Sequence, residues 1–115
     1  MEEIRLKILE YSKKLGVRAK RVSIKSMRSR WGSCSGDGNL NFNLWLVCLP
    51  RELIHYVVLH EVAHLKERNH GGKFKKILSE EFENRKALER TLKAMRISFN
   101  QVQRSGFSFE PCSKS

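Results

Sequence analysis

Residues 53–65 read LIHYVVLHEVAHL, and they form the strongest helical pattern in this chain. The segment is apolar nearly all the way round a helix, and Pro50 just before it supplies a pre-set first turn. Asn69, Gly71 and Gly72 follow where the helix should end, because Asn and Gly accept the left-handed backbone that closes a helix. A helix without a polar face is buried, so we expect this one at the centre of the molecule.

The same helix carries the pattern HExxH in His60, Glu61 and His64. Histidines four residues apart project from one helix face and can hold one metal ion, with the glutamate near the same pole. Two imidazoles on an apolar helix are costly to bury, and a bound cation gives them a partner and a reason to stay neutral. The alternative is a pair of hydrogen-bonded core histidines without a metal. We predict a site for one zinc ion.

A catalytic zinc ion takes three protein ligands and keeps a fourth position open. His70 is the predicted third ligand. On an unbroken helix it would lie about 9 Å beyond His64 along the axis, but the Asn and Gly residues of 69–72 allow the chain to turn back. Glu67, one turn past His64, should be solvated or support a ligand. The alternative third ligands are the carboxylates of the next helix, Glu80, Glu81 and Glu83.

This ligand set predicts a hydrolase, and in particular a peptidase. Zinc lowers the pKa of a bound water, Glu61 takes its proton as general base, and the hydroxide attacks a polarised carbonyl. Tyr56, one turn before His60, is either a hydrogen-bond donor to the developing oxyanion or a core residue, and its size favours the core. His55 lies roughly 140° from His60 round the helix, so we expect a structural or exposed role.

The segments before the central helix predict one helix and a small sheet. Residues 2–15 form an amphipathic pattern that Gly16 ends. Residues 22–26 and 39–47 alternate apolar and polar side chains as strands do, and the second run would place Leu40, Phe42, Leu44 and Leu46 on one side. The glycine-rich stretch 31–38 between them predicts a turn that joins an antiparallel pair.

The segments after the central helix predict more helix and then a tail. Phe74, Ile77, Leu78 and Phe82 begin a further helix, which residues 84–95 continue or follow with a second one. Gly106, Pro111 and scattered aromatic residues show no sustained period. We therefore expect a single domain over residues 1–96 and an irregular tail over residues 97–115.

Composition limits the function further. A chain of 115 residues with 40% apolar content fits one domain, whose core is too small to enclose a large cavity. The active site should then be a surface cleft that takes a polymeric substrate such as a polypeptide. The net charge of +11 makes nucleic acid a candidate partner through a basic surface, although such a charge can also serve solubility alone.

The sequence gives no sign of export or membrane insertion. No apolar run approaches the roughly 18 to 20 residues that span a bilayer, and residues 1–5 lack the order of a signal peptide. Cys34, Cys48 and Cys112 show no CxxC spacing, which fits reduced thiols. We expect a cytoplasmic protein without membrane contact.

Four stretches of the chain resemble the core of the YgjP-like metal-dependent hydrolases, which are relatives of the SprT and WLM zinc peptidases. They are Arg30-Trp31-Gly32-Ser33-Cys34-Ser35, then Asn41-Phe42-Asn43, then residues 56–65 around HExxH, then Asn69-His70 with Phe74. The resemblance implies an α+β, zincin-like fold, in which a small antiparallel sheet packs on the HExxH active-site helix with flanking helices. The lower strand of that sheet would bind the substrate in extended form.

The resemblance also favours His70 as third ligand, because SprT-like peptidases place theirs in a similar His-Gly-x-x-Phe segment, here residues 70–74. The role of residues 31–35 does not follow from it. We expect a tight turn with Trp31 packed beneath it, rather than Ser33 or Cys34 acting on the substrate.

Three functions compete on this basis. The first is a zinc-dependent metallopeptidase with Glu61 as general base. The second is a SprT-like protease that works on DNA, which the basic charge supports. The third is a non-catalytic binding module that zinc stabilises, with residues 99–111 occupying the cleft.

Overall fold

The computed structural model describes residues 2–104, with side chains as far as residue 96. Four α-helices, a three-stranded sheet and one 3-10 helix follow one another along this part of the chain. In order they are α1 (Glu2–Leu15), β1 (Arg21–Lys25), β2 (Gly32–Cys34), β3 (Asn39–Asn43), η1 (Leu44–Cys48), α2 (Arg51–Ala63), α3 (Gly72–Glu81) and α4 (Arg85–Arg104). The mixed architecture confirms the predicted α+β class.

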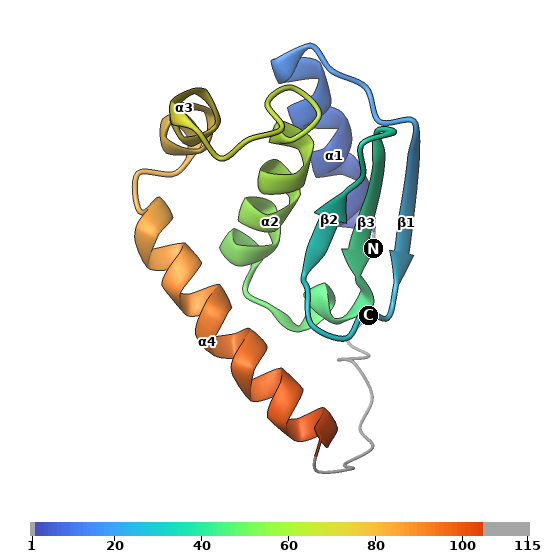
Figure 1. The fold of residues 1–115 in the computed structure, drawn as a ribbon, viewed down its shortest axis with the longest axis vertical. Helices are drawn as coiled ribbons and strands as arrows, with labels where there is room; N and C mark the ends of the chain where they lie inside the picture. The colour runs from blue at the N-terminus through green and yellow to red at the C-terminus, as the bar shows by residue number, and fades with distance from the viewer. Residues whose placement is uncertain (1, 105–115) are drawn as a thin grey trace.

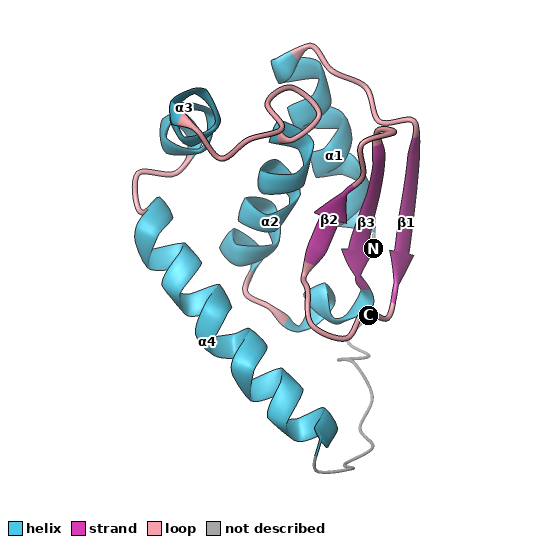
Figure 2. Cartoon of the chain, viewed as in Figure 1, coloured by secondary structure: helices cyan, strands magenta, loops and turns pink. Residues whose placement is uncertain are grey.

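Helix α2 occupies the centre of the molecule, as its sequence predicted. Figure 1 shows the sheet on one side of α2 and α4 on the other, and Figure 2 shows the same layers by type of element. Val58, Val62 and Ala63 of α2 are fully buried. They belong to one apolar cluster with the inward side chains of α1 and β3, among them Ile4, Ile8, Tyr11, Leu40 and Phe42.

The predicted antiparallel pairing of the first two strands is wrong in direction. The strand order is β1-β3-β2, and β1 pairs with β3 in parallel, with Val22 opposite Leu40. The antiparallel partner of β3 is β2, which lies within the stretch predicted as a turn. Strands β1 and β2 lie on opposite sides of β3. The chain that leaves β1 passes the end of β3 and returns along β2, so β1 and β2 run in opposite directions and β1 is parallel to β3.

The turn itself lies later than predicted. The Ser35 N–H donates to the carbonyl of Asn39 at 2.9 Å, and Gly38 closes the hairpin with a φ of 88°, which favours glycine. Gly32, Ser33 and Cys34 before it are strand residues. The glycine content of the stretch concealed a strand because glycine is read as a turn signal whatever element it lies in.

The predicted strand over residues 39–47 ends early, at Asn43. This side chain is 1% exposed; its amide donates to the carbonyls of Met27 and Arg30, and its Oδ1 accepts from the N–H of Trp45. The last bond caps η1, which replaces the second half of the predicted strand. Leu46 is still fully buried, but from a 3-10 helix.

The prediction that an irregular tail begins at residue 97 is also wrong. Helix α4 continues to Arg104, because no glycine or proline interrupts the chain before Gly106. The rest of the predicted tail, residues 105–115, lies outside the described residues. None of the helices over residues 2–104 has the length and apolar character that a membrane span needs.

Candidate active site

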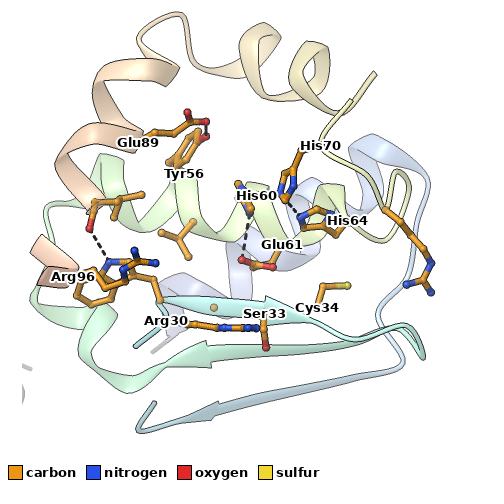
Figure 3. A pocket seen from close by; sticks show the side chains of 15 residues that line it. Arg30, Ser33, Cys34, Tyr56, His60, Glu61, His64, His70, Glu89 and Arg96 are labelled. Atoms are coloured by element: carbon orange, nitrogen blue, oxygen red, sulfur yellow. Dashed lines mark hydrogen bonds and ion pairs between the residues drawn. The ribbon is translucent and has the colours of Figure 1, made fainter. Parts of the chain in front are cut away.

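Three histidine side chains converge at the C-terminal end of α2. His60 lies in its last turn, His64 is the residue that ends it, and His70 lies in the loop before α3. Their ligand atoms all lie within 4.8 Å of one another. Figure 3 shows the three rings gathered on the same side of α2 as Glu61. No other three His, Cys, Asp or Glu side chains gather this closely in residues 2–96.

The chemistry of these donors fits a zinc ion. The Nδ1 atom of His64 lies 3.2 Å from the carbonyl oxygen of Glu67, so Nδ1 holds the proton and Nε2 presents a lone pair. That Nε2 lies 3.1 Å from the Nε2 of His70. Two nitrogen ligands of a tetrahedral zinc ion lie about 3.3 Å apart, and without a shared cation or proton the two lone pairs would repel each other.

The surroundings also favour neutral imidazoles. Burial, and after it the neighbouring His60, lowers the pKa of His64, as metal binding requires. Phe74 of α3 is 2% exposed; its ring stacks on His64 at a centroid distance of 4.4 Å and meets His70 edge-on at 4.7 Å. This packing fixes the orientation of the rings before any ligand arrives.

Glu61 points from α2 toward β2. Its side chain is buried, and its Oε2 lies 3.3 Å from Nδ1 of His60. A Cβ atom on Gly32 would lie 3.0 Å from Cγ of Glu61 and 3.1 Å from the backbone oxygen of Asn41. Any larger residue at this point of β2 would require Glu61 or the β3 backbone to shift by a few tenths of an ångström. This close approach gives one residue of the 31–35 motif a physical role that the sequence did not reveal.

A cleft of about 540 Å³ opens over Glu61 and the three histidines, in agreement with the expected surface cleft. Residues of α2 line one wall, and Gly32, Ser33 and Cys34 of β2 line the other (Figure 3). Glu89, Leu92 and Arg96 of α4 complete the lining. Among the described residues β3 is the only strand that pairs with β2, so the other edge of β2 has no partner strand.

Tyr56 is a core residue, as its size suggested. It is 2% exposed, and its hydroxyl donates to Glu89 of α4. Burial, followed by that bond, raises the pKa of the Tyr56 phenol. Its one proton is therefore committed to Glu89, which in turn lies 3.4 Å from Nη1 of Arg85.

The remaining candidates lie away from the histidine cluster. Glu80, Glu81 and Glu83 are not part of it, and Glu81 pairs with Lys14 of α1. Glu67 supports His64 through its backbone carbonyl, while no bond of its carboxylate occurs among the described residues. His55 has a structural role, since its Nε2 lies 2.6 Å from a carboxylate oxygen of Glu3.

The Trp31 and Cys34 side chains fit the structural role expected of their motif. Trp31 packs on the core, and its Nε1 donates to the carbonyl of Leu92, which ties the start of β2 to α4. Burial, and then the charge of Glu61, raises the pKa of the Cys34 thiol, so it stays protonated and weakly nucleophilic.

Sequence reasoning missed the contribution of α4 to the cleft. Glu89, Leu92 and Arg96 line the cleft and follow one another at spacings of three and four residues, so they share one face of the helix. That spacing was visible in the sequence. The spacing could not show that Trp31 donates to the Leu92 carbonyl and so places this face of α4 beside the cleft.

Comparisons with known proteins find similar solved structures and a matching family. The crystal structure of the metallopeptidase zymogen of Methanocaldococcus jannaschii jannalysin is similar, with 31% identity and a TM-score of 0.68 over 81% of this chain and 94% of that chain. The zymogen of Pyrococcus abyssi abylysin shares the fold, with 21% identity and a TM-score of 0.70 over 80% and 93% of the two chains. A search of curated protein sequences finds no match.

The sequence profile described as "YgjP-like, metallopeptidase domain" matches residues 1–95. This match includes the three histidines, Glu61 and β2, and it confirms the resemblance noted in the sequence. The chain belongs to the YgjP-like metallopeptidase family.

Proposed function

We propose that this protein is a zinc-dependent peptidase in which His60, His64 and His70 hold the metal and Glu61 is the general base. The observation that supports it most is the convergence of three imidazoles within 4.8 Å, beside a buried carboxylate, in an open cleft. A bound zinc ion would polarise the scissile carbonyl and make its water more acidic.

Glu61 performs the proton transfers in this proposal. Its carboxylate takes a proton from the attacking water and then delivers it to the leaving amine. The close packing of Gly32 against its Cγ limits where the carboxylate can lie. The Glu67 carbonyl accepts from Nδ1 of His64 and keeps that ring in the orientation in which its Nε2 can bind the metal.

The unpaired side of β2 suggests how a polypeptide binds. An extended chain can add to an exposed strand edge through main-chain hydrogen bonds, whatever its side chains are. Gly32, Ser33 and Cys34 line the cleft opposite the catalytic groups. A peptide bond held along β2 would therefore pass directly in front of Glu61.

Removal of the metal tests the proposed function. The purified protein should hydrolyse an unfolded polypeptide, lose that activity in the presence of a strong chelator, and regain it when stoichiometric zinc is added to the dialysed protein. Magnesium serves as the control, because nitrogen ligands discriminate against it. Hydrolysis that continues after metal removal would exclude this mechanism.

Replacing Gly32 with Ala should lower kcat without loss of zinc. The added Cβ would move Glu61 by a few tenths of an ångström. Because a misplacement of about 1 Å in a catalytic group can cost on the order of 100-fold in rate, we expect a loss of roughly severalfold. Rates and zinc content of the purified variant give the test. Gly36→Ala is the control, because a Cβ there meets the flexible end of Arg68. An unchanged kcat in Gly32→Ala would show that this contact does not position Glu61.

A further inference from the structure

Three arginine side chains line the cleft: Arg30, Arg68 and Arg96. Among residues 2–96 none of them forms an ion pair with a carboxylate, and of the two acidic residues of the lining only Glu89 is paired with a cation. Glu61 lies beside His60, and Glu89 is bound by Tyr56 and Arg85. The cleft therefore has positive charge that the described residues leave unneutralised.

The arginines lie near the two ends of β2. Arg30 directly precedes Trp31 at the start of the strand, and Figure 3 shows Arg96 of α4 on the same side of Glu61, away from His70. The bond from Trp31 to the Leu92 carbonyl brings this turn of α4 to the start of β2. Arg68 donates to the carbonyl of Gly36, beyond the other end of the strand.

The spacing relates these charges to a bound peptide. Glu61 faces Gly32, and Arg30 is two residues before it across a bend at Trp31, so their Cα atoms are no more than about 7 Å apart. An extended substrate beside β2 would thus bring a side chain two or three residues from the reacting bond within reach of Arg30 and Arg96. Guanidinium groups bind carboxylates through paired, charge-assisted hydrogen bonds.

We propose that the cleft selects polypeptide segments with acidic side chains two or three residues from the bond to be cleaved, and that Arg30 and Arg96 bind those carboxylates. Cleavage of these segments rests on the peptidase function proposed above, whereas the charge selectivity of binding does not. Arg68 is already engaged with the Gly36 carbonyl and adds to the positive field at the other end of the cleft.

Binding to the Glu61→Gln variant tests the selectivity without hydrolysis. The probes are three short fluorescein-labelled peptides that differ only at two neighbouring positions, which are both Glu, both Gln or both Lys. Fluorescence anisotropy at low salt should show the Glu peptide bound about tenfold more tightly than the Gln peptide. Adding Arg30→Glu and Arg96→Glu should remove this preference and favour the Lys peptide.

The matched control carries Arg90→Glu and Lys93→Glu, which change the net charge equally on exposed positions of α4 outside the cleft lining. This control should keep the preference for the Glu peptide. A second pair, Arg30→Gln and Arg96→Gln, should lose the preference without introducing new repulsion. Circular dichroism and zinc content would establish that each variant is folded.

Equal affinity for the three peptides would overturn the proposal, and so would a preference that survives in both cleft variants. A labelled single-stranded DNA oligonucleotide that binds only when Arg30 and Arg96 are present, without discrimination among peptides, would assign these residues to nucleic acid instead. Charge-selective binding by a wild-type protein that hydrolyses no peptide would contradict the peptidase function alone. Hydrolysis without charge preference would contradict only this inference.

Discussion

Glu61→Gln is expected to lower the rate of peptide hydrolysis roughly 10²- to 10⁴-fold while the zinc content stays unchanged. Glutamine has nearly the same shape, so it can occupy the space between His60 and Gly32, but its amide cannot accept the proton of the attacking water. Initial rates on an unfolded polypeptide, together with metal analysis of the same sample, provide the measurement.

The control for this variant is Glu67→Gln. Glu67 supports His64 through its backbone carbonyl, which the substitution leaves in place, so activity should remain near that of the wild type. Substantial hydrolysis by Glu61→Gln would mean that another group is the base, or that the activity comes from a contaminant. Loss of zinc in Glu61→Gln would instead make Glu61 part of the metal site.

His70→Ala is expected to weaken zinc binding by more than about 100-fold, beyond what the loss of a merely supporting partner costs. His70 lies in the loop before α3 and supplies one of three nitrogen ligands in the proposed site, so its removal leaves only the two ligands of α2. Competition with a fluorescent zinc chelator measures the affinity, and peptide hydrolysis should fall in parallel.

The matched control is His55→Ala, which removes a histidine that lies outside the cluster. His55 pairs with Glu3 of α1, so the change should cost some stability and leave the zinc affinity unaltered. Equal zinc affinity in His70→Ala and the wild type would rule out His70 as a ligand, and the third ligand would then have to be another group, such as a carboxylate.

The features that the sequence predicted are those that depend on local pattern. The apolar run of 53–65 required a buried helix, and α2 is central. HExxH spacing placed His60 and His64 on one face, and the glycines after residue 69 allowed His70 to reach them. The structure brings the three rings together, while their binding of zinc stays a prediction.

The features that the sequence did not reveal depend on contacts between distant segments. Strand β1 is parallel to β3 because β2 comes between them in the chain but lies on the other side of β3 in the sheet. The alternation of apolar residues predicts a strand but does not determine which strand it pairs with. The contact of Gly32 with Glu61 joins residues from β2 and α2. The cleft residues of α4 are positioned by contacts with distant segments, the bond from Trp31 to Leu92 and the bond from Tyr56 to Glu89.

Zinc K-edge X-ray absorption of the wild-type protein would test the central claim most directly. We predict three histidine nitrogen ligands at about 2.0–2.1 Å, recognised by the scattering pattern of their imidazole rings, and one oxygen ligand at the open position. A sulfur ligand at about 2.3 Å would place Cys34 in the site, and a zinc-free protein would remove the basis for this mechanism.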